Sequence, residues 1–184
     1  MLTPGRNRIY DSLRDKLKAA SGKPEELIWL LAFNFWLGAS CVTTESAVRE
    51  LLDRAAIHEV LLRYARGVDR RDFALVASCF MPGAAYDGAL AQSTIENALA
   101  ALPERMARYH STMHFLGNQL VELNGDTAHS ETYAVAYHRL TAGGVSQLRV
   151  VAIRYLDDLV RHVEQWRIQR RVVKMEWERT DTLG

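Results

Sequence analysis

The stretch "STMHFLGNQLVELNGDTAHSETYAVAYHRL", residues 111–140, changes side-chain character at every second position, which is typical of strands with one buried face. An Asn124-Gly125 pair divides it and favours the tight turn of a hairpin. We therefore expect antiparallel strands over about 112–123 and 126–140. Beyond the turn, one face carries only small residues: Ala128, Ser130, Thr132, Ala134 and Ala136. Such a face permits close packing of a helix and equally leaves room for a ligand.

Two further strands are expected over 145–160 and 164–178, with a looser turn at Gly143-Gly144 before them. Upstream of residue 110 the apolar residues recur every three or four positions, as in amphipathic helices. Helices followed by an antiparallel meander predict an α+β domain in which the helices cover one face of the sheet.

Three helices are expected before these strands. The first covers about 43–69, and the second begins with Asp69 as its cap and stops at Pro82. The third covers 93–110 and is interrupted or bent by Pro103. A short strand or turn lies between the second and third helices.

Composition narrows the class of function. With 184 residues, 23 basic and 22 acidic side chains, the chain suits one compact domain with almost no net charge. No long-range field favours nucleic acid or an anionic membrane. Cys41 and Cys79 show no metal-ligand spacing, which argues against structural zinc and predicts a reducing, cytoplasmic location.

Residues 1–42 are expected to be an N-terminal extension, and residues 43–180 the working domain. The extension combines a short amphipathic helix with an uncharged apolar run over 27–42, which is too short for a comfortable membrane span. Its "LGASC" is similar to a lipoprotein cleavage box, but the leucine lies one position too far from Cys41. Export or lipid anchoring is therefore the less favoured alternative to an accessory helix or a poorly folding extension.

Four segments together resemble the SnoaL-like branch of the nuclear transport factor 2-like superfamily: "IHEVLLRYARGVDRRDF", "YHSTMHFLGNQLVELNGDTA", "AYHR" and "RYLDDLVRHVEQWRIQRRVVKMEW". The resemblance implies a cone-shaped barrel in which a curved, mainly antiparallel sheet and three helices enclose an apolar cavity. The superfamily includes scytalone dehydratase, bile acid 7-alpha-dehydratase and gamma-hexachlorocyclohexane dehydrochlorinase, and also proteins without catalytic activity. It therefore implies the fold more strongly than the reaction.

The resemblance also singles out site residues. Asp69 and His114 match an aspartate and a histidine shared by the two dehydratases and the dehydrochlorinase. Tyr64 matches the catalytic tyrosine of the bile acid enzyme, and Arg171 resembles its arginine after the last tryptophan. His138 matches the second histidine of scytalone dehydratase if one residue is skipped at the hairpin. The asparagine of that enzyme has no counterpart, so scytalone itself is not the expected substrate.

These residue types suit the elimination of water without a cofactor or metal. A histidine can take a proton from carbon, and a carboxylate on its other ring nitrogen stabilises the imidazolium that forms. We expect His114 to be the base, Asp69 to orient it, and Tyr64 with Arg171 to position or polarise the substrate. The expected substrate is a small hydrophobic cyclic alcohol of steroid-like, terpenoid or polyketide type.

Each assignment has an alternative. Asp69 could be a helix cap, Tyr64 a core residue, Arg171 an outward strand residue and His114 a strand histidine without a role. The cavity could instead serve an isomerase or cyclase, or a protein that binds a small ligand or a partner without turnover. A homodimer or homotrimer is expected through the sheet face that carries Tyr133, Val135 and Tyr137.

The position of His138 depends on the hairpin. A two-residue Asn124-Gly125 turn would put His114 opposite Val135 and leave His138 on the other face. A bulge or a three-residue loop would bring both histidines to one face.

Overall fold

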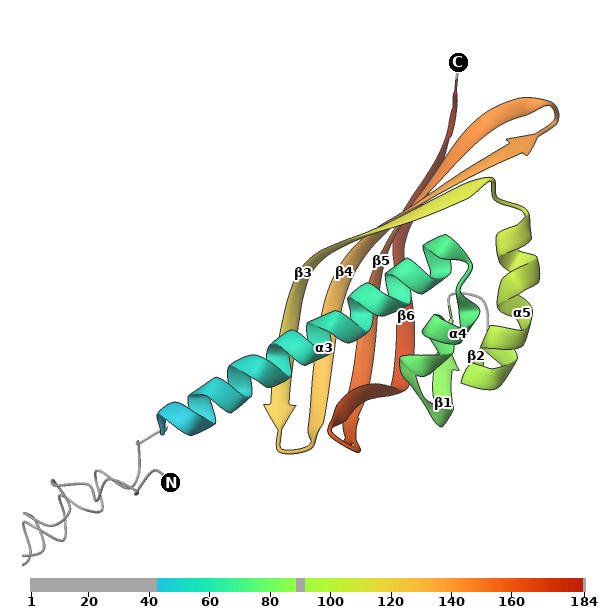
Figure 1. Ribbon diagram of the computed structural model, residues 1–184. Coiled ribbons are helices and arrows are strands. Elements are labelled where there is room, and N and C mark those ends of the chain that lie inside the picture. Colours follow the sequence, from blue (N-terminus) through green and yellow to red (C-terminus); the bar gives the residue numbers. More distant parts are fainter. Residues whose placement is uncertain (1–42, 89–91, 184) are drawn as a thin grey trace, which may run out of the picture. The chain divides into compact units, whose positions relative to one another are not determined.

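A computed structural model describes residues 43–88 and 92–183 of the chain (Figure 1). The chain divides between Ala47 and Val48 into two units, and the fold below is that of the second unit. The predictions for residues 1–42 lie outside the described residues. None of the helices in the described ranges is long and apolar enough to cross a membrane.

Three helices precede or interrupt the sheet in the described residues: α3 (Thr44–Arg70), α4 (Phe73–Ser78) and α5 (Ile95–Ala107). The cap of α4 is Asp72, whose Oδ1 accepts from the Leu75 backbone N–H at 2.9 Å. The prediction that Asp69 caps this helix was wrong, because α3 continues past Asp69 and its carboxylate has other partners. The third helix runs without a break through Pro103.

Within residues 43–88 and 92–183, six strands form one sheet in the order β2-β1-β6-β5-β4-β3 (Figure 1). Their bounds are β1 Phe80–Asp87, β2 Gln92–Thr94, β3 Ser111–Asn124, β4 Thr127–Ala142, β5 Val145–His162 and β6 Gln165–Thr182. Of these six strands, only β1 and β6 pair in parallel, so the predicted α+β class with a mainly antiparallel sheet is confirmed. Pro82, expected to stop a helix, lies inside β1 instead.

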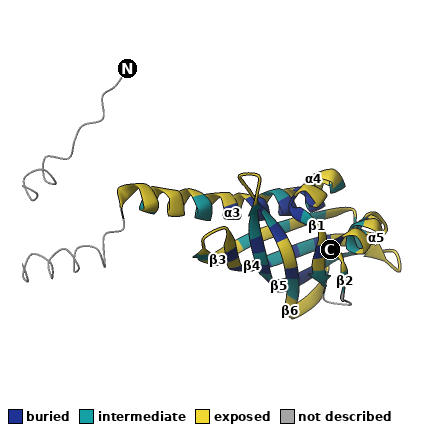
Figure 2. Cartoon of the chain, turned by 90° about the horizontal axis from the view of Figure 1, so that it is seen from below, coloured by how far each residue is buried: buried dark blue, intermediate teal, exposed yellow. Residues whose placement is uncertain are grey.

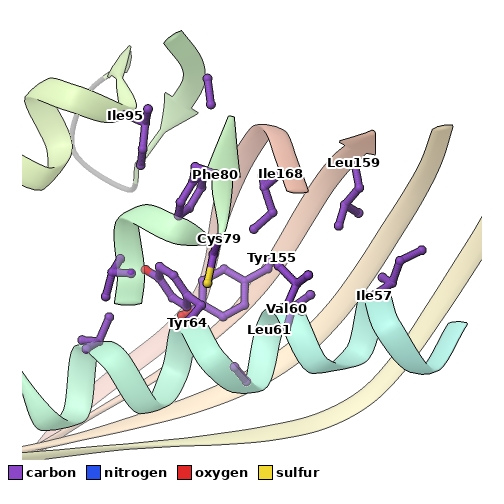
Figure 3. Packing of buried hydrophobic residues seen from close by; sticks show 14 of the residues in the cluster. Ile57, Val60, Leu61, Tyr64, Cys79, Phe80, Ile95, Tyr155, Leu159 and Ile168 are labelled. Atoms are coloured by element: carbon purple, nitrogen blue, oxygen red, sulfur yellow. The ribbon is translucent and has the colours of Figure 1, made fainter. Parts of the chain in front are cut away.

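Helix α3 lies across one face of the sheet, and its buried residues follow the helical repeat (Figures 1 and 3). Ile57, Leu61 and Tyr64 pack with apolar residues of β5 and β6 in one cluster. The small residues of β4 are all buried, as expected for a face that helices approach closely, and buried positions alternate along the strands (Figure 2). By contrast, the first apolar residues of the helix, among them Leu51 and Leu52, are exposed.

A β-bulge in β3 decides which side chains share a face. The hairpin pairs Asn124 with Thr127, so its turn lies one residue later than expected. This change moves the pairing by two positions, so by itself it leaves every side chain on the face predicted for it. Between Gln119 and Leu116 the register then shifts by one. Beyond the bulge His114 pairs with Ala136 and Thr112 with His138. The bulge alternative is therefore confirmed, and both histidines point to the helix-covered face.

Gly117 lies at this bulge. A Cβ at this position would be in ordinary van der Waals contact, 3.4 Å from the Tyr133 carbonyl oxygen. A glycine inside a strand often marks such a bulge.

Candidate active site

A pocket of about 370 Å³ lies between helix α5, the end of α3 and the sheet. Most of its lining residues are apolar, and its volume is within the roughly 300–1,000 Å³ usual for small-molecule sites. Its polar lining residues are Tyr64, Tyr86, Ser93, Asn97, Arg105, His114, His138, Arg149 and Tyr155. Among the residues that the structure describes, no group of three or more His, Cys, Asp or Glu could hold a metal ion.

His114 of β3 and Asp69 of α3 are joined by two hydrogen bonds at this pocket. His114 Nδ1 lies 2.7 Å from Asp69 Oδ1, and the His114 backbone N–H donates to Asp69 Oδ2 at 2.8 Å. Because a carboxylate only accepts, Nδ1 carries the proton in the neutral ring and Nε2 is left as a base. The His114 side chain is 8% exposed and belongs to the pocket wall.

The Asp69 carboxylate is held in its ionised form. Burial raises the pKa of this carboxyl, but hydrogen bonds from the His114 ring and backbone, and from Thr112, outweigh burial and lower the pKa below its ordinary value. Thr112 is itself fixed by Arg71, whose Nη1 donates to the Thr112 hydroxyl at 2.8 Å. A carboxylate in this position fixes the tautomer of the histidine and stabilises its protonated form.

His138 is a second, neutral imidazole beside the first. The ring centroids of His114 and His138 are 6.0 Å apart, and His138 is 8% exposed. Burial, followed by the positive charges of His114 and Arg149, lowers the pKa of His138 to about 4. Its Nδ1 is buried without a hydrogen-bond partner among the described residues. His138 is therefore uncharged at neutral pH.

Three tyrosines form the wall next to the histidines. The rings of Tyr64 and Tyr155 meet edge to face with centroids 5.6 Å apart (Figure 3). Burial raises the pKa of both Tyr155 and Tyr86 above the ordinary value, and a hydrogen bond with Tyr64 raises that of Tyr86 further. The hydroxyls of Tyr86 and Tyr155 therefore keep their protons and can donate hydrogen bonds.

Arg171 lies behind these rings and is not among the residues that line the pocket. It is fully buried, and its Nε and Nη2 each lie 2.7 Å from an oxygen of Asp157. The guanidinium carbon is 4.2 Å from the ring centroids of both Tyr64 and Tyr155. Burial lowers the pKa of Arg171, but the charge of Asp157 outweighs it and raises the pKa above its ordinary value.

The structure thus brings the predicted residues together in two layers. Tyr64, His114 and His138 line the pocket, while Asp69 and Arg171 lie behind them and hold them. Three members of this cluster were not predicted from the sequence: Tyr86, Tyr155 and Asp157. An acidic residue within the apolar run "RYLDDLV" was the one visible signal, because a buried carboxylate needs a partner.

Residues 49–172 match the model of the SnoaL-like domain family. The chain belongs to this SnoaL-like family. The uncharacterized protein Rv2910c of Mycobacterium tuberculosis H37Rv is 30% identical over 131 residues, which cover 68% of this chain and 87% of that protein.

Among solved structures, a hexachlorocyclohexane dehydrochlorinase (LinA) type 2 aligns with a TM-score of 0.66 and 22% identity, covering 76% of this chain and 94% of that one. LinA-type3 from Novosphingobium barchaimii LL02 aligns with a TM-score of 0.64 and 20% identity, covering 76% and 95%. At this identity the two alignments show a shared fold.

Proposed function

We propose that this SnoaL-like protein is a cofactor-independent lyase that eliminates water from a small hydrophobic cyclic alcohol. The observation that carries the proposal is the His114–Asp69 pair, bonded at 2.7 Å, with its ring in the wall of a 370 Å³ pocket. The dehydrochlorinases among the structural neighbours agree with an elimination, although their similarity extends only to the fold.

In the proposed reaction His114 Nε2 takes a proton from the carbon next to an electron-withdrawing carbonyl. The pair of electrons left on carbon forms the double bond while the neighbouring carbon–oxygen bond breaks. The imidazolium returns its proton to the departing hydroxyl, so water leaves and the ring is neutral again. Asp69 stabilises the imidazolium between these two steps, and a tyrosine hydroxyl of the wall donates to the substrate carbonyl as negative charge develops there.

Arg171 has an indirect part in this proposal. Its guanidinium stacks against Tyr64 and Tyr155 and is neutralised by Asp157, so it fixes the tyrosine wall rather than contacting substrate. Because His138 is neutral, no second positive charge lies on it beside the imidazolium that forms at His114.

The test is a panel of cyclic β-hydroxy ketones incubated with the protein and followed by NMR. We expect at least one to lose water and form the conjugated ketone, and His114→Gln to abolish this conversion. A matched control is His129→Gln, since His129 also bonds an aspartate through Nδ1 but lies away from the pocket. Products of unchanged mass would favour an isomerase or cyclase, and binding without any conversion would favour a ligand-binding protein.

We also propose that the protein forms a homodimer or homotrimer through the outer sheet face. Several large apolar side chains are exposed there: Met113, Phe115, Leu120, Tyr133 and Trp177. An apolar patch of this kind on a soluble protein usually marks an interface. Light scattering of the native chain and of Phe115→Glu tests this, and a native monomer would contradict it.

A further inference from the structure

One charged part of the pocket wall has no role in the proposed reaction. Helix α5 turns Asn97, Ala101 and Arg105 toward the pocket, one helical turn apart. Asn97 and Arg105 are exposed, unlike the His114 side chain, so they belong to the solvent side of the pocket. A ligand bound against His114 would therefore have its far end near these two side chains.

Arg105 carries the charge on this part of the wall. Within the described residues it makes no hydrogen bond and no ion pair, whereas Arg149, the other arginine of the wall, binds Glu178 and the Tyr109 hydroxyl. The residues three or four positions from Arg105 are Ala101, Leu102, Arg108 and Tyr109, none of which is acidic.

Among the described lining residues, the ionised side chains are arginines, and Arg149 is already paired with Glu178, so the unbalanced charge is that of Arg105. Two arginines line the pocket, and no aspartate or glutamate is among the described lining residues. Asp69 lies behind His114 and is occupied by it. A concave apolar wall with unbalanced positive charge attracts an anion, because the low dielectric of the wall strengthens the field inside.

We propose that the ligand of this pocket carries an oxyanion, which Arg105 binds while the apolar body lies against His114. A carboxylate fits best, because the guanidinium fork can donate two parallel hydrogen bonds to its two oxygens. The substrate class is then a cyclic hydroxy compound with an acidic group remote from the reacting carbons. The term substrate rests on the proposed function, but the preference for an anionic ligand does not.

Three probes of one shape test the preference: 2-naphthoate, naphthalene-2-sulfonate and the neutral 2-naphthamide. Their dissociation constants are measured by calorimetry with the full chain at low salt. We expect the naphthoate to bind about tenfold more tightly than the amide, as for a charge-assisted hydrogen bond. Arg105→Gln should remove this difference by weakening naphthoate only. Binding of the sulfonate at equal strength would assign the site to oxyanions in general, and weaker sulfonate binding would assign it to carboxylates.

Arg108→Gln is the matched control, because Arg108 lies in the same helix end and carries the same charge but does not line the pocket. It should change none of the constants by more than about twofold. Equal binding of naphthoate and amide to the native chain would overturn the proposal. So would equal losses in Arg105→Gln and Arg108→Gln, or no binding of any probe at millimolar concentration.

The same measurements on His114→Gln separate this inference from the proposed function. Retained anion preference together with lost dehydration supports both. If the native chain dehydrates nothing yet prefers naphthoate in an Arg105-dependent way, the lyase proposal fails and the ligand class stands. If dehydration is found but naphthamide binds as well as naphthoate, the reverse holds.

Discussion

Among the described residues of this domain, two histidine–aspartate pairs have nearly the same bond length but lie in different surroundings. His114 Nδ1 lies 2.7 Å from Asp69, and His129 Nδ1 lies 2.9 Å from Asp158. The side chains of the first pair are 8% and 20% exposed, those of the second 50% and 49%. The bond length therefore does not distinguish a candidate catalytic pair from a surface pair, whereas burial does.

The second difference is how the carboxylate is held. Asp69 also accepts from the backbone N–H of His114, across 45 residues of sequence, while Asp158 faces His129 directly on the neighbouring strand. His129 and Asp158 even line a larger cavity, of about 470 Å³. Because both are half exposed, water competes for their bond, so we expect no catalysis there.

The largest expected effect is on turnover. Asp69→Asn keeps the size of the side chain but removes the charge that stabilises the imidazolium, so kcat should fall by about 10²- to 10⁴-fold. Asp158→Asn should leave kcat unchanged. Steady-state kinetics with a substrate found in the ketone panel would measure both.

The control for this prediction is a measurement that the Asp69→Asn variant keeps the native fold. Near-ultraviolet circular dichroism should show that Asp69→Asn retains native packing, since the amide oxygen can still accept from the His114 backbone. If the two asparagine variants had equal activity, the contrast between the buried and the exposed pair would carry no catalytic meaning.

The next effect concerns stability and compares a buried with an exposed arginine–aspartate pair of β5 and β6. Arg171 and Asp157 are fully buried together, whereas Arg170 and Asp158, one residue along each strand, form an exposed pair at 3.7 Å. Arg171→Met leaves a buried carboxylate unpaired and should cost about 3–5 kcal/mol of unfolding free energy. Arg170→Met should cost less than about 1 kcal/mol.

Urea unfolding of both variants measures this difference. The double variant Arg171→Met with Asp157→Leu should recover much of the loss, because it removes the unpaired charge as well. A double variant as unstable as Arg171→Met alone would show that the stacking of the guanidinium on the tyrosines, and not the ion pair, is the main contribution.

The sequence could predict the elements that depend on local pattern. The four long strands, the α+β class and the long first helix follow from periodicity, and the family resemblance selected Asp69 and His114. The face on which His138 lies could not be decided from the sequence. One extra residue in β3 exchanges the two faces of the strand, and no local sequence pattern predicts where such a bulge occurs. The burial of Arg171 could not be predicted either, because its partner Asp157 comes from a neighbouring strand and its stacking rings from α3 and β5.

The third effect is a pH dependence of stability that arises from the buried His138. Its folded-state pKa of about 4 lies below the ordinary value of 6.5, so the unfolded chain binds a proton that the folded chain does not between these values. Stability should therefore fall as pH decreases from 6.5 to 4, by about 3 kcal/mol. Asp69, whose folded pKa is lowered from 3.8, adds its loss only below that range.

The measurement is the urea midpoint at several pH values across this window. His138→Phe should flatten the dependence, because the titrating group is gone. A native chain of constant stability over the window would mean that His138 is solvated rather than buried.

The smallest effect is expected at the exposed pair itself. Asp158→Asn removes the bond to His129 and the longer contact to Arg170, and should change the unfolding free energy by only about 0.2–1 kcal/mol, because solvent screens both. The change should also shrink further when the salt concentration is raised. A loss of more than about 2 kcal/mol would exceed the range of exposed ion pairs. It would show that this pair is more strongly coupled to the fold than its exposure indicates, and the contrast with His114–Asp69 would then rest on the pocket and not on solvent.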